Sequence, residues 1–348
     1  MNTPKEKVIL GFSGGVDSAC CAIMLKEKGY DVIGLYIEVL EPSDKSALSA
    51  AQKAAEAIGM ELVVRGAAED FEELVIKPFC DSYASGETPN PCVRCNPALK
   101  FAILAEEADR RNAQYIASGH YARLEFYNKY YYVKRAKCLE KDQSYMLCRL
   151  TQTQLSRLLL PMGDMFSKQE ARELLRSRGI PNSEAKDSQD ICFLPDGDYR
   201  SFLVGRGITA AKGNFISPEG EIYGPHEGSF CYTVGQRKGL GIALGNPVFV
   251  SEIRQNGDVV LSPEEKLLKK HVEIRDVMYT GLDAVKGGQF TAKLRYTKQE
   301  AECFLEPIGQ AEALLMFKTP QRAPAPGQEA VVYDGERIVA CGKIAGSY

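Results

Sequence analysis

The chain has 348 residues, of which 45% are hydrophobic and 26% are charged, and its formal net charge is −3 at pH 7. This composition is typical of a globular protein with two or three domains, taking roughly 150 residues per domain, and it excludes a disordered or fibrous chain. The weak negative charge argues against non-specific nucleic-acid binding, although it permits a local basic face.

The start of the chain and its cysteines predict a compartment. No apolar run approaches the about 20 residues of a membrane span, and residues 1–7 lack the apolar core of a signal peptide. We therefore expect a cytoplasmic protein that is not bound to a membrane. In that compartment the 11 cysteines are expected to serve chemistry or metal binding before structural disulfides.

The first distinctive stretch is Gly11-Phe-Ser-Gly-Gly-Val-Asp-Ser18. It follows an apolar run at residues 8–10, a predicted strand, and precedes residues 19–28, a predicted helix. A Gly-rich turn in that setting exposes backbone N–H groups at the positive end of the helix dipole, which favours phosphate binding over a mere chain reversal. The loop lacks the lysine of the usual P-loop, and Asp17 is predicted to help hold Mg²⁺.

Strands and helices then alternate, which predicts a parallel, doubly wound sheet with helices on both faces. Ligands of such sheets lie at the carboxyl ends of the strands, so Ile37, Gly119 and His120 are expected to share one crevice with the loop. The further predicted strands are residues 31–39, 61–65 and 114–118, and the predicted helices are residues 47–58 and 69–83, the latter interrupted at Pro78.

Residues 85–96 contain two prolines and a glycine, and we predict an exposed loop there. Asn96 is then the N-cap and Pro97 the first residue of the next helix. Cys95 would lie immediately before that helix, where a thiolate is favoured and the thiol is unusually nucleophilic. Cys92 and Cys95 could alternatively form half of a zinc site, but a second cysteine pair is missing.

Residues 122–126 and 130–135 alternate around Asn128 and Lys129 and predict a hairpin. The basic residues that follow could be a solvated edge or could contact RNA phosphates, and the sequence does not separate these two interpretations. Residues 167–178 predict a helix capped by Ser167, with Glu170 placed for a capping box.

Beyond Gly205 the chain changes to short alternating segments with clustered glycines, typical of small β domains. We therefore predict an α/β, parallel doubly wound domain over residues 1–204, a small β-rich central domain over residues 205–268 and a C-terminal β-barrel over residues 269–348.

Four separated motifs carry a resemblance to a known family: residues 11–18, Thr88-Pro-Asn-Pro-x-x-x-Cys-Asn96, Lys141-Asp-Gln-Ser-Tyr145 and Ser188-Gln-Asp-Ile-Cys-Phe193. The first resembles the signature of the PP-loop ATP pyrophosphatases, which have an adenine nucleotide hydrolase-like fold. Together the four resemble the tRNA-specific 2-thiouridylases. That resemblance implies a sulfurtransferase that adenylates the C2 oxygen of the wobble uridine of tRNA, replaces it with sulfur and releases AMP and pyrophosphate.

The resemblance also implies roles for individual residues. ATP would contact Gly11, Phe12, Ser13, Gly14, Gly15, Val16, Asp17, Ser18, Ile37 and Gly119. The target base would approach Asn90, Pro91 and Cys92, and other parts of the tRNA would contact His120, Lys141, Asp142, Gln143, Arg295, Tyr296 and Gln328. Cys95 would be the nucleophile and Cys192 the carrier of persulfide sulfur. The implied cofactors are ATP and Mg²⁺, and the implied partners are tRNA and a sulfur donor, which could be a cysteine desulfurase, a sulfur-relay protein or sulfide.

One position departs from the family pattern. Many members carry Asp where this chain has Cys92, which gives Cys92, Cys95 and Cys192 together. Three thiolates are one short of the usual four ligands of a 4Fe-4S cluster, which would leave one iron open. This pattern resembles the cluster-dependent tRNA thiolases, so the persulfide route and the cluster route both stay open.

Two other functions compete with this reading. One is another PP-loop ligase that adenylates a small molecule, although such a ligase would not need the cysteine loop. The other is a metal- or redox-responsive RNA-binding module with a vestigial nucleotide site, which ATP turnover would exclude.

Overall fold

The computed structural model describes residues 5–40, 46–181, 191–194, 197–208, 212–281, 284–297 and 299–348. Contacts divide the chain into two compact units. The first unit comprises Met1–Val75, Cys92–Gln189 and Glu336–Ile338, and the second comprises Ile76–Pro91, Asp190–Gly335 and Val339–Tyr348.

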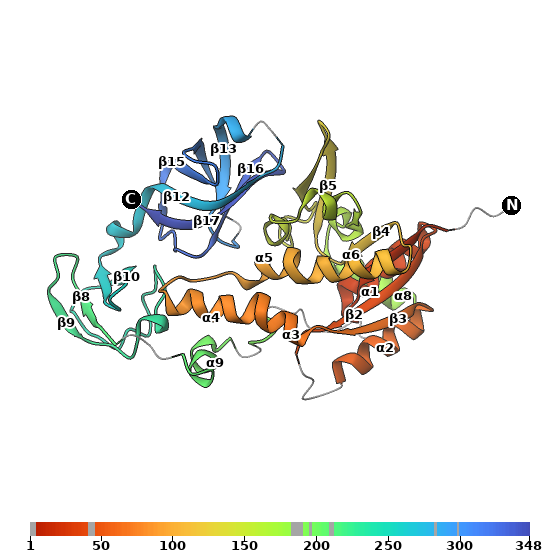
Figure 1. Ribbon diagram of the computed structural model, residues 1–348, viewed down its shortest axis with the longest axis horizontal. Helices are drawn as coiled ribbons and strands as arrows, with labels where there is room; N and C mark the ends of the chain where they lie inside the picture. Colours follow the sequence, from red (N-terminus) through yellow and green to blue (C-terminus); the bar gives the residue numbers. More distant parts are fainter. Residues whose placement is uncertain are drawn as a thin grey trace. The chain divides into compact units, whose positions relative to one another are not determined.

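A parallel five-stranded sheet forms the centre of the first unit, with strand order β3-β2-β1-β4-β7 (Figure 1). The order turns back on itself between β1 and β4, because the chain goes outward from β1 through β2 to β3 and then returns to the other side of β1. Ligands of doubly wound sheets bind at this switch point, at the carboxyl ends of the strands. The strands are β1 (Lys7–Gly11), β2 (Asp31–Glu38), β3 (Glu61–Gly66), β4 (Tyr115–Ser118) and β7 (Leu158–Leu159).

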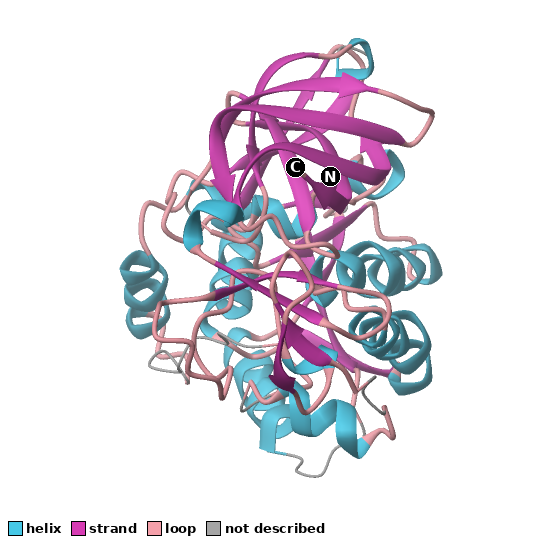
Figure 2. Cartoon of the chain, turned by 90° about the vertical axis from the view of Figure 1, so that its left-hand side faces the viewer, coloured by secondary structure: helices cyan, strands magenta, loops and turns pink. Residues whose placement is uncertain are grey.

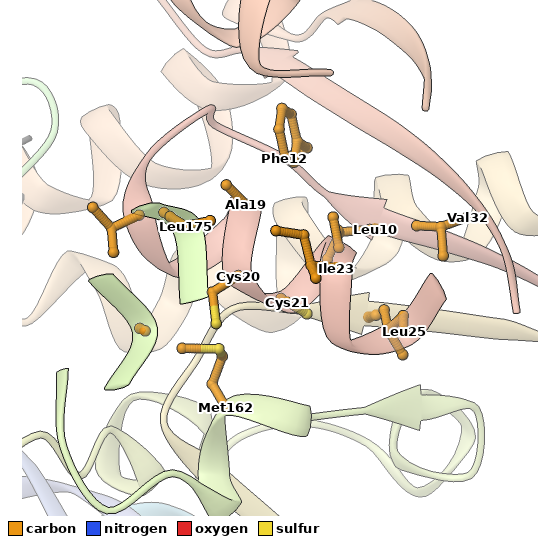
Figure 3. Packing of buried hydrophobic residues seen from close by; sticks show 14 of the residues in the cluster. Leu10, Phe12, Ala19, Cys20, Cys21, Ile23, Leu25, Val32, Met162 and Leu175 are labelled. Atoms are coloured by element: carbon orange, nitrogen blue, oxygen red, sulfur yellow. The ribbon is translucent and has the colours of Figure 1, made fainter. Parts of the chain in front are cut away.

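Helices cover this sheet, which explains why β1 is apolar along its length. Val8, Ile9 and Leu10 are completely buried, as expected for a parallel strand covered on both faces. In the core cluster Ala19 and Ile23 of α1 pack with Leu175 of α8 (Figure 3). The main helices of this unit are α1 (Val16–Glu27), α2 (Ser46–Ile58), α6 (Phe101–Arg110), α7 (Gln152–Leu155) and α8 (Lys168–Ser177).

The prediction of a loop over residues 85–96 is wrong at its end. A helix begins at Pro91 and continues through α5 (Pro91–Cys95) and a π-helical turn (Asn96–Lys100) into α6. Pro91 suits the first helical position, where its missing N–H costs nothing. Pro97 lies inside the helix and has no N–H to donate to the preceding turn. The wider π turn accommodates the loss of this hydrogen bond. Asn96 is therefore not an N-cap, and Cys95 does not precede the helix.

At Pro78, where an interruption is predicted, the helix also continues through a π turn. A helix runs through α3 (Ala68–Phe71), a π turn (Glu72–Ile76) and α4 (Lys77–Ala84). The predicted hairpin is confirmed as β5 (Ala122–Tyr127) and β6 (Tyr130–Arg135), with Asn128 and Lys129 at positive φ in its turn. Positive φ at two successive turn residues is typical of a type I′ turn.

Two β structures make up most of the second unit. A four-stranded sheet has the order β10-β11-β8-β9. A barrel has the order β12-β15-β14-β13-β16-β17 and closes through pairing of β17 with β12, and its strands are visible in Figure 2. The strands are β8 (Asn214–Ile216), β9 (Ile222–Pro225), β10 (Phe249–Ile253), β11 (Val259–Ser262), β12 (Leu268–Tyr279), β13 (Gly288–Lys293), β14 (Ala301–Pro307), β15 (Glu312–Arg322), β16 (Glu329–Asp334) and β17 (Arg337–Ser347).

The second unit also has a helical part. Phe79 and Tyr83 of α4 contact the aromatic rings of Phe193, Tyr199 and Phe202, and the last two belong to α9 (Tyr199–Gly205). Short 3-10 turns occur in both units at Ser144–Leu147, Pro161–Asp164, Ser229–Cys231, Glu264–Leu267 and Ala284–Lys286.

The predicted fold class is confirmed: a parallel α/β sheet precedes a small β domain and a closed antiparallel barrel. Across the parts of the chain that the structure describes, no helix has both the length and the apolar character needed to cross a bilayer.

Candidate active site

The loop after β1 has the geometry that the sequence predicts for a phosphate site. Gly14 has φ +75°, and a Cβ there would lie 2.5 Å from Cα of Ala51 in α2, so only glycine fits. The Gly15 N–H donates to Ser13 Oγ at 3.3 Å, and the Ser18 hydroxyl donates to the Gly15 carbonyl at 3.0 Å. α1 begins at Val16, three residues earlier than predicted, so the loop enters the helix directly. The loop therefore ends at the positive end of the α1 dipole, a position that favours an anion.

The end of β4 meets this loop in the first unit. A Cβ on Gly119 would lie 3.0 Å from the backbone of Asp17 and Ser18, so glycine permits the close approach of the two segments. The next residue, His120, is half-buried, and its Nδ1 lies 2.6 Å from Ser118 Oγ. Burial, aided by the positive charge of Lys100, lowers the pKa of His120 to about 3. The imidazole is therefore neutral near pH 7 and can form hydrogen bonds without carrying charge.

Asp17 accepts two hydrogen bonds that the sequence does not predict. The Tyr121 hydroxyl donates to its Oδ1 at 3.1 Å, and the Lys168 ammonium lies 3.1 Å from its Oδ2. Burial raises the pKa of the Tyr121 hydroxyl, which keeps its proton for donation. Each carboxylate oxygen retains a second lone pair, so Asp17 remains suited to Mg²⁺, which prefers oxygen ligands. Lys168 follows the predicted cap Ser167, but sequence spacing does not reveal that it reaches residue 17.

The Lys141–Gln143 segment packs under the same turn. The Gln143 side chain accepts a hydrogen bond from Tyr121 N at 2.9 Å, and Gln143 N donates to Tyr121 O at 2.8 Å. The Asp142 carboxylate is buried and accepts hydrogen bonds from Ala136 N, Ser144 N and Ser144 Oγ. Gln143 thus connects through Tyr121 to Asp17, whereas Asp142 fixes the shape of its own segment.

The two neighbouring cysteines occupy the beginning of the long helix. Cys92 is the second residue of α5 and is half-buried, while Cys95 ends α5 and is 4% exposed. A spacing of three residues puts both thiols on one face of the helix, which suits two ligands of a metal or cluster. The Asn96 amide donates to Met146 O at 2.8 Å and holds the π turn in place.

In the second unit the segment before this helix is fastened to the barrel. Thr88 N donates to Pro326 O at 2.8 Å, and the Gln328 amide donates to Thr88 O at 2.8 Å. The Glu87 carboxylate pairs with Arg275 of β12 and Lys343 of β17. These contacts position the segment that leads to Asn90 and Pro91.

The remaining predicted residues lie in the second unit or at the carboxyl end of β2. The Arg295 guanidinium donates to Ala323 O at 2.7 Å, and Tyr296 is exposed. Cys192 is exposed, whereas Ser188, Gln189 and Asp190 lie outside the described residues. Ile37 is part of the carboxyl end of β2, where the sequence places it. None of the 11 cysteines forms a disulfide.

Comparisons with known proteins cover nearly the whole chain. Three family models match in succession: "tRNA methyl transferase HUP domain" at residues 6–196, "tRNA methyl transferase PRC-barrel domain" at residues 200–262 and "Aminomethyltransferase beta-barrel domain" at residues 269–344. The chain is 37% identical to tRNA-specific 2-thiouridylase MnmA of Clostridium perfringens over 354 residues, 98% of each chain. It is 39% identical to MnmA 1 of Caldanaerobacter subterraneus over 356 residues, which cover 97% of this chain and 98% of the relative.

Proposed function

The chain belongs to the family of tRNA-specific 2-thiouridylases and is a tRNA sulfurtransferase. We propose that it binds ATP at the loop of residues 11–18, uses it to adenylate the C2 oxygen of the wobble uridine of tRNA, and replaces that oxygen with sulfur. The products are 2-thiouridine, AMP and pyrophosphate. The observation that carries the proposal is the loop itself: Gly14 and Gly15 place no side chain over its backbone, and the loop enters the N-terminus of α1 beside Gly119, at the switch point of the sheet.

The chemistry explains why both a nucleotide and a thiol are needed. The C2 carbonyl of uracil is a poor electrophile without a leaving group, and adenylation makes its oxygen part of AMP, a good leaving group. Phosphates bind at the loop N–H groups, and Asp17 would hold Mg²⁺, which supplies positive charge to the phosphates. A wobble base in an anticodon loop can be splayed from its stack into a pocket. Asn90 and Pro91 are the residues we assign to that pocket.

The thiols have assigned roles in the second step. Cys95 is the nucleophile, and Cys192 carries a persulfide whose outer sulfur is transferred from a persulfide of a cysteine desulfurase or a sulfur-relay protein. Sulfide is already fully reduced and, as the alternative donor, would attack the adenylated C2 directly without a persulfide on Cys192. The exposure of Cys192 supports its role as persulfide carrier, because a donor must reach its sulfur. A 4Fe-4S cluster held by Cys92, Cys95 and Cys192 is the second candidate route, and the shared helix face of Cys92 and Cys95 favours it. Iron content and visible absorbance of protein reconstituted without oxygen separate the two routes.

The assigned tRNA contacts differ in what surrounds them. His120, Lys141 and Gln143 belong to the segments that meet Asp17, so they could couple tRNA binding to the nucleotide. Arg295 and Tyr296 provide a cation and an exposed ring, which suit phosphate contact and base stacking. Asp142 and Gln328 already bind protein atoms, and we assign them a positioning role toward tRNA. A tRNA substrate also supports a cytoplasmic location.

The test is formation of 2-thiouridine on tRNA with ATP, Mg²⁺ and sulfide. We expect tRNA-dependent pyrophosphate release by the wild type, and its loss in Asp17→Asn with tRNA affinity unchanged, because this change weakens the metal site and not the RNA contacts. Pyrophosphate release with small acids instead of tRNA would favour the small-molecule ligase. An absence of ATP turnover would favour the RNA-binding module. The full-length match to 2-thiouridylases favours neither alternative.

A further inference from the structure

Lys168 brings a positive charge to a loop that contains none of its own. Its ammonium Nζ lies 3.1 Å from Asp17 Oδ2, although the two residues are 151 positions apart in the chain. The Lys168 side chain is 13% exposed, against 34% for Asp17. The cation is thus held at the phosphate loop with little contact to water.

The position of Lys168 is unfavourable unless negative charge lies nearby. It is the first residue of α8, directly after the cap Ser167. A helix N-terminus carries partial positive charge from its unpaired N–H groups and disfavours a cation, and removal of the ammonium from water adds to that cost. Asp17 compensates one charge. The phosphates of a nucleotide at the same loop would supply several more.

We propose that Lys168 is the phosphate-binding cation of the nucleotide site and neutralises the pyrophosphate as it leaves. This inference rests on the proposed adenylation. In that step the uridine O2 forms a bond to the α-phosphorus, and the bond from that phosphorus to the oxygen bridging to the β-phosphorus breaks. The electron pair of the broken bond goes to pyrophosphate, and the N3 proton of uridine passes to water. The Lys168 ammonium stays protonated and donates to the pyrophosphate oxygens, while Asp17 keeps it at the loop.

A purely structural role predicts something different, and the chain offers a matched control. α1 and α8 lie side by side, and a second ion pair joins Glu27 and Arg178 at their other ends, also 151 residues apart. These side chains are 45% and 56% exposed. If Lys168 only fastens α8 to α1, then loss of either pair has the same consequence.

The experiment compares Lys168→Gln, Lys168→Arg and Arg178→Gln in the full chain. The readouts are kcat/KM for ATP in tRNA-dependent pyrophosphate release, the Kd for tRNA and the unfolding temperature. We expect Lys168→Gln to lower kcat/KM for ATP on the order of 10²-fold, as for loss of one charge-stabilising donor, with the tRNA Kd unchanged. We expect Lys168→Arg to retain part of the activity with a higher KM for ATP, because a planar guanidinium does not replace a compact ammonium. Arg178→Gln should behave as wild type.

Equal kcat/KM for ATP in Lys168→Gln and Arg178→Gln would overturn the inference, as would a parallel loss of tRNA affinity in Lys168→Gln. If Lys168→Gln does not fold, Lys168→Arg decides, since it keeps the ion pair with Asp17: an unchanged KM for ATP then overturns the inference. Failure of the proposed function looks different, because the wild type itself would release no pyrophosphate with tRNA.

Discussion

At the scale of single residues, the environment decides which of many similar side chains can react. Seven cysteines are buried, and burial raises the pKa of Cys20 and Cys303 to about 12. A thiol with such a pKa is not a nucleophile near pH 7. Composition alone predicts that the cysteines serve chemistry, but most of them pack in the core as small apolar residues. Burial does not separate the assigned thiols from the rest, because Cys95 is itself buried while Cys92 is half-buried and Cys192 is exposed. The motifs around these three residues, and not the cysteine count, are the basis of their assignment.

Histidine burial makes the stability of the protein depend on pH. The folded pKa of His120 is about 3, below the value of about 6.5 for an unfolded chain. The stabilisation is complete above about pH 6.5 and is lost as pH falls toward 3, because the unfolded state takes up the proton first. Between pH 7.5 and 5.5 His120 should lower the free energy of unfolding by about 1.4 kcal/mol.

Denaturant unfolding of the wild type and His120→Gln at both pH values measures this difference. His226 contributes with the same sign, because burial lowers its pKa and its Nδ1 accepts a hydrogen bond from Gly228 N at 3.0 Å. A variant with both His120→Gln and His226→Gln should therefore lose most of the pH dependence of the free energy of unfolding between pH 7.5 and 5.5. An unchanged dependence in His120→Gln would show that its imidazole is already solvated in the folded state.

At the scale of elements, the sequence predicts β1, β2, β3, β4 and the hairpin well, but it does not predict the short strand β7. Residues 8–10 and 31–39 are apolar runs of strand length, and Asn128 and Lys129 are suited to a tight turn. The helix at Pro91 is missed because proline predicts a break by local rules, whereas a π turn lets the helix continue.

The residues of the candidate site also fall into two groups: those in contiguous motifs, which the sequence predicts, and those that depend on distant contacts, which it does not. Contiguous stretches such as residues 11–18 are readable in the sequence because their spacing carries the geometry. Tyr121 and Lys168 are not, since their roles depend on contacts 104 and 151 residues away in the chain. Gln328 is assigned to tRNA by family pattern, but in the structure its amide is used by Thr88.

The π turn at Pro97 is predicted to set the orientation of the cysteine helix. Pro97→Ala restores an N–H and lets a regular α-helix form, which would rotate Cys92 and Cys95 by about 100° relative to α6. We expect an equal or higher unfolding temperature and a thiolation rate lower by about tenfold, or about 1.4 kcal/mol. Pro78→Ala is the control, because it follows the other π turn in α4, where no site residue is assigned. A wild-type thiolation rate in Pro97→Ala would show that the π turn does not set a thiol orientation that the reaction needs.

At the scale of the whole molecule, distant parts of the sequence combine in each unit. The second unit contains Ile76–Pro91 together with the barrel, so the segment before the cysteine helix folds with residues more than 180 positions later, such as Arg275 at a separation of 188. Gly327, at φ +94°, permits the close approach of its own segment to Thr88, because a Cβ on residue 327 would lie 2.8 Å from Thr88 N. The barrel therefore holds the segment that leads to the assigned base pocket.

This arrangement predicts that Glu87 positions the segment of Asn90 and Pro91 through Arg275 and Lys343. The Glu87 side chain is 16% exposed, whereas Arg275 is 46% and Lys343 is 26% exposed. Loss of the carboxylate therefore leaves both cations partly solvated but removes the group that fastens the segment to β12 and β17. We expect Glu87→Gln to lower kcat for thiolation about tenfold, or by about 1.4 kcal/mol, while the Kd for tRNA stays within about twofold of wild type, because no phosphate contact is removed. Glu302→Gln breaks the exposed pair of Glu302 with Lys318 on the same barrel and should change neither quantity. Gln328→Ala should follow Glu87→Gln if its amide acts through Thr88. A weaker tRNA Kd with unchanged kcat in Gln328→Ala would instead make Gln328 a direct tRNA contact and limit the positioning role to Glu87.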